Sequence, residues 1–349
     1  SMKKRRPRQV DVAALANVSP AIVSLVINGR VNGNVRISQE AQQRVWDAIY
    51  ELGYVVNPVA RKLAGNQSRM LGVFTYEAIF PLEYHDFYYP FLIGIEEEAQ
   101  AQDYDLLLFT RPDGSGKRSI YKDGVNSLQV SDGSILLGVY EEPDEITRLL
   151  AEGFPFVYVG RREIPGEEIA YVAADYVDAT RQVVAYMHSQ GHRQIAYLYD
   201  HDGRRREAQH DRQQGYILAV RELSIKEQLI ACSASAFTPE RLQHYLAAGI
   251  TAILFETVNY AHLLLSAASV LGKSVPRDIS CAILGDPLNE IQNIPDLTSF
   301  SIPRREMGRE AVRLLIDLLT EGHTIENRQI TLPCTFVRGQ TVVPPPDNG

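Results

Sequence analysis

The side chains in this sequence with the best chemistry for holding a small molecule are aromatic rings, arginines and acids that follow apolar runs. Phe87 and Tyr88 lie in HDFYYPF. Arg161 follows FVYVG, and Arg212 lies in DRQQGY. A flat ring can stack on the apolar face of a sugar or on a base, and a guanidinium fork can bind hydroxyls or carboxylates through two hydrogen bonds. For either arginine alone, a solvated surface charge is the commoner explanation. Whether they bind a ligand therefore depends on the helices and strands that position them.

No constellation typical of catalysis or metal binding stands out. The segment DGSGKR at 113–118 has glycines and a lysine but lacks the spacing of a phosphate-binding loop. His188 and His192 are four residues apart, but Gly191 between them is expected to end the helix. There is no GxSxG and no zinc-ligand spacing, so we expect no enzyme activity, no metal and no cofactor. The cysteines lie far apart, without a CxxC pair, and are predicted to be buried thiols in a reducing compartment: Cys232, Cys281 and Cys334.

Charge divides the chain into a basic head and an acidic remainder. Residues 1–69 carry 11 Lys and Arg against 4 Asp and Glu, a net charge of +7, whereas residues 70–349 carry 24 against 39, a net charge of −15. This layout is expected when only the head meets a polyanion. No stretch approaches the roughly 18 apolar residues that cross a membrane, and KKRRPR is not followed by the apolar core of a secretory signal. We therefore expect a cytoplasmic protein with no membrane contact.

The basic head has the pattern of two short helices joined by a tight turn. Apolar residues at helical spacing predict a first helix that ends at Asn17, since Asn tolerates the left-handed conformation of such a turn. Ser19 suits an N-cap and Pro20 suits the first position of a second helix, which is expected to stop at Asn28-Gly29. This arrangement is a helix-turn-helix unit.

A third helix and a short fourth segment complete the head. The third helix is expected to begin after Ser38 and to end at Gly53, and its apolar face would close a three-helix core. Residues 57–65, NPVARKLAG, predict a helix that is too short to be stable alone. Its Leu63 can part a base step in the minor groove while cations meet phosphates, which suits a hinge that folds only on DNA. A plain linker is the alternative.

The remainder alternates apolar strand patterns with amphipathic helices, which predicts parallel sheets. Two such runs indicate two α/β lobes with a cleft between them, where ligands bind beyond the carboxyl ends of the strands. An aromatic-rich loop at 76–91 is expected to precede the first helix of the body, FLIGIEEEAQAQ. The expected domains are a headpiece at 1–55, a hinge and linker at 56–69, and an effector-binding and dimerisation core at 70–349, with lobes of about 70–174 plus 300–328 and 175–299 plus 329–349.

The head and the body together resemble the LacI/GalR family of bacterial repressors. The run DVAALANVSPAIVSLVIN is similar to the headpiece pattern of that family, and RVWDAIYELGYVVNPVARKLAG is similar to its ELGY.PN link and its N..A..L hinge helix. The resemblance covers the whole chain. It implies an all-α helix-turn-helix headpiece followed by an α/β two-lobe effector domain like that of periplasmic binding proteins. It also implies a sequence-specific DNA-binding repressor whose operator affinity is set by a small molecule, a sugar or glycoside.

The resemblance assigns DNA contacts by position. Pro20, Ala21 and Leu25 occupy the sites of the second helix that reach base edges, and Leu63 matches the intercalating leucine of the hinge. Other positions that match DNA-contacting sites of the family are Ser19, Ile22, Ser24, Asn28, Ser38, Tyr54, Asn57, Val59, Ala60 and Lys62. Because Pro20 and Ala21 lack hydrogen-bonding side chains, readout there is expected to depend on contact with thymine methyls, and more of the specificity on the hinge and on DNA shape.

The resemblance likewise implies an effector site in the cleft. Arg212 matches the arginine that binds effector hydroxyls or carboxylates in relatives. The other candidate positions are Tyr76, Phe87, Tyr88, Arg111, Arg161, Glu256, Thr257 and Asp286. Thr257-Val258 stands where relatives carry Asn-Asp, and ILGD keeps only Asp286 of a GYDD-like turn, so the usual acceptors for sugar hydroxyls are partly missing. These departures, with the long aromatic loop, favour a larger or glycosidic ligand over a simple monosaccharide.

The expected partners are a near-palindromic double-stranded operator, a small-molecule effector and a second copy of the chain. Paired heads of a homodimer would read half-sites about one helical turn apart. A higher oligomer, a regulator that responds to a nucleoside, and a solute-binding protein of the same two-lobe fold stay open as alternatives. The solute-binding protein would need an export signal. The expected location is the bacterial cytoplasm, at the nucleoid.

Overall fold

The structure, a computed structural model, divides into two compact units, one of Ser1–Leu71 with Gln129–Asp132 and one of Gly72–Leu128 with Gly133–Gly349. It describes residues 7–28, 31, 36–55, 67–78, 82–112, 114–139, 141–201, 206–287, 296–322 and 325–346. Five residues of the predicted hinge lie outside the described residues: Asn57, Val59, Ala60, Lys62 and Leu63.

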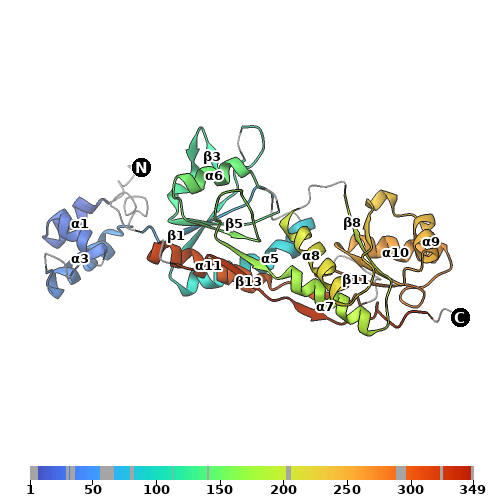
Figure 1. Cartoon of the computed structure of the whole chain (residues 1–349). Helices are drawn as coiled ribbons and strands as arrows, with labels where there is room; N and C mark the ends of the chain where they lie inside the picture. Colours follow the sequence, from blue (N-terminus) through green and yellow to red (C-terminus); the bar gives the residue numbers. More distant parts are fainter. Residues whose placement is uncertain are drawn as a thin grey trace. The chain divides into compact units, whose positions relative to one another are not determined.

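The described part of the head contains three helices, as the sequence predicts (Figure 1): α1 (Gln9–Ala16), α2 (Pro20–Ile27) and α3 (Gln39–Leu52). Asn17 adopts the predicted left-handed conformation, with a φ of 51°. The hydroxyls of Ser19 and Ser38 accept backbone N–H groups as N-caps. α1 and α2 are bent by 103° to each other, within the range of helix-turn-helix units. No described helix is by itself long and apolar enough to cross a membrane; only α1 and α2 counted together reach those limits.

The core of the head is built from apolar residues of all three helices. Val12, Val23 and Val45 come from the three different helices, and each is 0% exposed. One hydrogen bond also joins α3 to the end of α1: the Arg44 Nε donates to the Ala16 carbonyl, 3.2 Å away. The carbonyls at a helix C-terminus have no partner within the helix, so this bond fixes α3 against the turn.

A six-stranded sheet, in the order β13-β7-β6-β5-β1-β2, forms the first lobe, together with helices α5, α6 and α11 (Figure 1). Strands β5, β6, β7 and β13 pair in parallel, as the alternation of strands and helices predicts. The elements of this lobe are β1 (Met70–Phe74), α5 (Leu82–Ala101), β2 (Asp105–Phe109), β3 (Tyr121–Lys122), β4 (Val125–Asn126), η1 (Ser127–Val130), β5 (Gly133–Leu136), α6 (Pro143–Ala151), β6 (Phe156–Val159), β7 (Tyr171–Ala174), α11 (Arg304–Glu321) and β13 (Gln329–Leu332).

The second lobe has a four-stranded sheet in the order β11-β10-β8-β9. Its strands also pair in parallel, and the core cluster against them is apolar and buried. The elements are α7 (Tyr176–Ser189), β8 (Ile195–Tyr199), α8 (Glu207–Glu222), β9 (Leu229–Ala231), η2 (Ala234–Ala236), α9 (Pro239–Ala247), β10 (Ala252–Phe255), α10 (Asn259–Val270) and β11 (Ser280–Ile283), with an antiparallel pair of β12 (Ser299–Ser301) and β14 (Thr335–Val337).

Two predictions about the body are wrong. The sequence assigned everything from residue 329 to the second lobe, but β13 pairs with β7 in the first sheet, Ile330 beside Val172. α11 packs on β5, β6 and β7, so the chain leaves this helix beside the first sheet, and that packing rather than the strand's own residues selects its partner. The aromatic segment at 76–91 is also not a loop throughout, because α5 is already helical from Leu82 and continues through Pro90. The proline removes one hydrogen bond, which the burial of Phe91 and the next turns offsets.

The backbones of α5 and α11 touch where they cross. A Cβ on Gly94 would lie 1.9 Å from the Arg305 carbonyl oxygen, and a Cβ on Gly308 would lie 2.3 Å from the Phe91 carbonyl oxygen. A side chain at either glycine would therefore force the helices apart.

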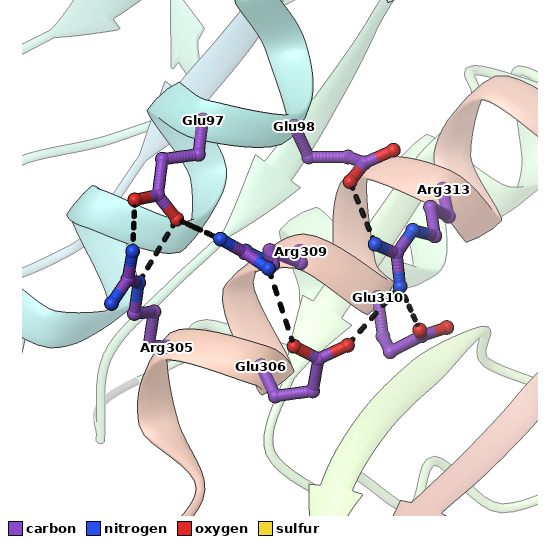
Figure 2. A network of polar contacts seen from close by, with 7 residues as sticks. All are labelled: Glu97, Glu98, Arg305, Glu306, Arg309, Glu310 and Arg313. Carbon is purple, nitrogen blue, oxygen red and sulfur yellow. Dashed lines mark hydrogen bonds and ion pairs between the residues drawn. The ribbon is translucent and has the colours of Figure 1, made fainter. Parts of the chain in front are cut away.

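Ion pairs flank this crossing, as Figure 2 shows. The Glu97 carboxylate binds Arg305 and Arg309, and Glu98 lies 2.9 Å from Arg313. Hydrogen bonds from Arg305 and Arg309 lower the pKa of Glu97 to about 2, so this carboxylate stays ionised at neutral pH. The helix that carries Phe87 and the helix that begins at Arg304 are thus held to each other by backbone contact and by charge.

His192 is 1% exposed and joins the second lobe to the C-terminal segment. Its Nδ1 lies 2.8 Å from Thr251 Oγ1, and its Nε2 lies 2.8 Å from the Val343 carbonyl oxygen. Because a carbonyl only accepts, Nε2 carries the proton of the neutral ring and Nδ1 accepts from the Thr251 hydroxyl.

We expect the free energy of unfolding of the body to fall as pH is lowered through the ordinary pKa of histidine. Burial lowers the pKa of His192, so the unfolded chain binds a proton that the fold resists. The contribution of His192 is complete above about pH 6.5, declines below it, and levels off once the pH is under the lowered pKa. Far-UV circular dichroism during urea unfolding at about pH 7.5 and about pH 5.5 measures this change. Tryptophan fluorescence would not, because the one tryptophan, Trp46, lies in the head and reports only on it.

Two variants isolate the contribution of this histidine. His192→Gln should lose that part of the pH dependence, whereas His244→Gln, at an exposed site of α9, should keep it. An equal pH dependence in His192→Gln and in the unmodified chain would contradict the assignment.

Candidate functional site

The first turn of α2 carries the exposed part of the predicted base-reading surface. Ser19, Pro20 and Ala21 are exposed, and the Ser19 hydroxyl accepts the Ile22 N–H at 3.3 Å. Ile22 and Leu25 are half-buried and pack against the core of the head, so only part of each side chain can face a duplex. The exposed positions therefore offer small, apolar contacts and a serine hydroxyl, which is compatible with the predicted readout through methyl groups.

The ends of α2 and α3 supply polar groups around this surface. The Asn28 amide, at the end of α2, donates to Ser24 Oγ at 3.3 Å. Ser38 is exposed at the start of α3, where free backbone N–H groups favour an anion such as phosphate. Tyr54 is half-buried against the core of the head, and burial raises the pKa of its hydroxyl, which stays a neutral donor.

Arg212 lies on α8 with its guanidinium stacked on a ring. The guanidinium carbon is 3.8 Å from the centroid of Tyr176 and 5.9 Å from that of Phe300. Nε donates to the Leu284 carbonyl at 2.6 Å and Nη1 to the Ala208 carbonyl at 3.0 Å. Two of its nitrogens are thus bound to backbone oxygens, and among the described residues Nη2 has no hydrogen-bond acceptor. That nitrogen is the one positioned to bind a ligand.

Asp286 and Phe87 are brought together by an arginine that the sequence did not single out. Arg304, the first residue of α11, binds Asp286 Oδ2, and its guanidinium carbon is 5.0 Å from the centroid of Phe87. The same Oδ2 accepts the Ile302 N–H at 3.2 Å. The predicted sugar acceptor is therefore already partly engaged, through its Oδ2 atom. The only signal for Arg304 in the sequence is its position just after the strand β12.

The two candidate rings of α5 have different roles. Tyr88 is 1% exposed and packs edge-on against Phe87, with ring centroids 4.9 Å apart. It therefore supports Phe87 and does not offer a face to a ligand, contrary to the prediction. Phe87 is half-buried and meets Arg304, which leaves it as the ring of this pair that a ligand can touch.

Other candidates are held in local contacts. The Tyr76 hydroxyl donates to Glu145 at 2.9 Å, and burial and this carboxylate raise its pKa far above the ordinary value. Glu256 accepts the hydroxyl of the buried Tyr197 at 2.5 Å. Arg111 is exposed, and its carbonyl accepts a hydrogen bond from Lys122. No contact between described residues joins these side chains to Arg212, Asp286 or Phe87.

Thr257 is exposed after β10, and Arg161 is engaged across the two lobes. Arg161 donates two hydrogen bonds to Asp211 of α8, at 2.9 and 2.6 Å, and also binds Glu163. Its guanidinium is therefore occupied by protein carboxylates. The structure thus gathers Phe87, Arg212 and Asp286 around Arg304, Tyr176 and Phe300, which brings rings, cations and an acid into one cluster.

The cysteines belong to the packed interior. Cys232, Cys281 and Cys334 are buried and unpaired, and burial raises the pKa of the Cys281 thiol to about 12. Among the described residues, no group of three or more His, Cys, Asp and Glu side chains could hold a metal ion.

Two families of known proteins match the chain. The bacterial regulatory proteins of the lacI family match residues 10–57, and the periplasmic binding protein-like domain matches residues 184–342. The HTH-type transcriptional regulator CelR of Thermobifida fusca is 29% identical over 338 residues, 95% of this chain and 96% of that protein. The HTH-type transcriptional repressor CytR of Escherichia coli K12 is 29% identical over 339 residues, 95% of each chain.

Solved structures agree along the whole chain. A CelR–cellobiose complex superposes with a TM-score of 0.60 at 25% identity, covering 96% of this chain and 100% of that one. The lac repressor dimer bound to operator and the anti-inducer ONPF superposes with a TM-score of 0.67 at 22% identity, covering 97% and 100%, and shows the fold alone. With a helix-turn-helix head that matches the lacI family of bacterial regulatory proteins and a two-lobe α/β body that matches the periplasmic binding protein-like domain, the chain is similar over nearly its full length to HTH-type transcriptional regulators.

Proposed function

We propose that the chain is a homodimeric repressor whose affinity for a near-palindromic operator is set by a sugar or glycoside bound between the lobes. The observation that carries this is the cluster of Arg212, Asp286 and Phe87 in a chain that also carries a helix-turn-helix head. Aromatic faces bind the apolar side of a sugar, while an arginine donor and a carboxylate oxygen bind its hydroxyls. The cellobiose complex of a relative that is similar over the full length supports this class of ligand.

Lobe closure gives such a ligand a way to act on the head. A small molecule shifts the equilibrium between two states only by its difference in affinity for them. Phe87 belongs to the first lobe and Arg212 to the second, so a ligand that contacts both favours one angle between the lobes. Because a regulator of this kind works where its operator is, we propose that the chain acts at the bacterial nucleoid.

Two experiments with the full chain test the proposal. Selection from a random pool of duplexes should enrich near-palindromes with two half-sites, and thermal-shift screening should find a stabilising ligand among disaccharides, glycosides and nucleosides. A ligand at about 100 times its Kd should add about 2.7 kcal/mol to the free energy of unfolding. A pool that stays random would refute operator binding, and a response to nucleosides alone would refute the sugar.

The first lobe offers a surface for the second copy. A groove of about 700 Å³ lies between α5 and the edge strand β2, and its apolar lining includes Leu92, Tyr104, Leu106 and Leu108. Leu106 and Leu108 are 37% and 39% exposed. An apolar edge strand with free backbone groups invites pairing with another chain. A two-fold operator requires a two-fold protein, so the occupant we propose is the same groove of a second copy.

Leu106→Lys should weaken the dimer at least about tenfold, because each copy would lose an apolar contact and would have to take a charge out of water at the interface. Analytical ultracentrifugation over a range of concentrations measures this. Val337→Lys is the matched control, since Val337 is 40% exposed in β14 and lies in a different sheet. Equal dimer affinity in Leu106→Lys and the unmodified chain would move the interface elsewhere.

A further inference from the structure

Direct ion pairs connect the two lobes at one side of the body. From the first lobe, Arg161 follows β6 and forms the two-pronged bond to Asp211 of α8 in the second lobe. Their side chains are only 22% and 19% exposed, so the pair is partly shielded from water while the lobes are closed. Once the lobes part, both charges meet solvent and its ions, so added salt favours the open state.

A second contact between the lobes lies deeper. Glu141, after β5, binds Arg206 Nη1 at 2.8 Å, and Arg206 precedes α8 of the second lobe. The Glu141 side chain is 11% exposed and that of Arg206 is 7% exposed. The same carboxylate binds Arg162 of its own lobe at 2.7 Å. Glu141 thus stays paired when the lobes separate, whereas Arg206 loses this carboxylate.

The first-lobe side of these contacts is held rigid. Arg162 donates to the Gly138 carbonyl at 2.6 Å and to the Arg161 carbonyl at 2.7 Å, and it stacks over Tyr158 at 4.3 Å. The backbone N–H of Glu163 adds a bond to Glu207 of α8 at 3.1 Å. Three residues at the start of α8 thus contact this rigid surface: Arg206, Glu207 and Asp211. Arg212 lies on the same helix.

We propose that two ion pairs, Arg161–Asp211 and Glu141–Arg206, together with the hydrogen bond from the Glu163 N–H to the Glu207 carboxylate, form a latch that holds the lobes closed. Separation of the lobes would break all three contacts at once, while the pairs inside each lobe would remain. The latch makes the closed state depend on ionic strength, and it does so whatever ligand or operator the chain binds.

Spin-label distances across the cleft test the latch in the full chain. Ala151→Cys at the end of α6 and Ala247→Cys at the end of α9 place labels on exposed sites of the two lobes, and the native cysteines are buried. Dilution with an excess of unlabelled chain keeps the measured pair within one protomer. Pulsed dipolar spectroscopy then gives the open and closed populations.

The variants remove the second-lobe partners and leave Glu141–Arg162 intact. Arg206→Gln with Asp211→Asn should raise the ratio of open to closed protein about tenfold or more. Removing one partner of a buried charge pair costs more free energy than a tenfold change in an equilibrium constant requires. Glu222→Gln is the control, since it removes the Arg181–Glu222 pair between α7 and α8 of the same lobe. Circular dichroism confirms that each variant is folded.

Salt provides a second readout. Raising the ionic strength from about 0.05 M to about 1 M should lengthen the distances in the unmodified latch and leave the double variant unchanged. Identical distances in the double variant and the intact latch, or an equal shift in Glu222→Gln, would overturn the proposal. So would distances in the intact latch that do not respond to salt.

Discussion

Replacing Arg212 by alanine is expected to abolish the response to the effector while leaving operator binding intact. The guanidinium is fixed by the Leu284 and Ala208 carbonyls and by stacking on Tyr176, so Nη2 is preorganised for a ligand. The loss of a charged hydrogen-bond donor should weaken effector binding about 10- to 100-fold. Isothermal titration with the sugar found by screening, and operator titration with and without it, measure the two effects.

Two controls show whether Arg212 acts through the ligand. Arg212→Lys keeps the charge but loses the planar fork, so it should restore stability more than effector affinity. Arg181→Ala removes another arginine of the second lobe, one paired with Glu222 at an exposed site, and should leave the effector response unchanged. Full induction in Arg212→Ala would exclude this residue from the site.

Leu63→Ala is expected to weaken specific operator binding about 10- to 100-fold and to reduce DNA bending. The sequence predicts that this leucine enters the minor groove from a hinge that folds only on DNA, and truncation removes most of a buried leucine from each of two copies. Binding should be followed by anisotropy of a labelled operator at fixed salt, and bending by the mobility of circularly permuted duplexes. Leu15→Ala, at an exposed apolar residue of α1, should change neither.

The structure shows how the chain is anchored just beyond the hinge. Ser68 donates to the Asp132 carboxylate through its N–H at 2.7 Å and its hydroxyl at 2.8 Å, and the Arg69 N–H adds a third bond at 2.9 Å. Asp132 directly precedes β5. The backbone at Ser68 and Arg69 is thus fixed by a single carboxylate, that of Asp132. Unchanged affinity and bend in Leu63→Ala would instead make residues 57–65 a plain linker.

The helix-turn-helix head could be derived from the sequence because its determinants are local. Asn17 permits the turn, and Ser19 and Ser38 cap the helices that follow them, each through residues three or four positions away. The periodicity of Val12, Val23 and Val45 placed the core of the head correctly. The alternation of strands and helices gave the two parallel sheets of the body for the same reason, since each element shows its own period.

The tertiary structure alone decided which distant elements meet. The residues of β13 do not specify β7 as their neighbour; the packing of α11 on the first sheet does. Arg304 joins Asp286 to Phe87, and Arg161 is bound by Asp211, although no spacing in the chain connects these pairs. Side-chain period and capping act over a few residues, whereas the site and the latch depend on how whole lobes close. The sequence by itself therefore determined a DNA-reading head on a two-lobe body, and the fold decided which of the candidate side chains are free for a ligand.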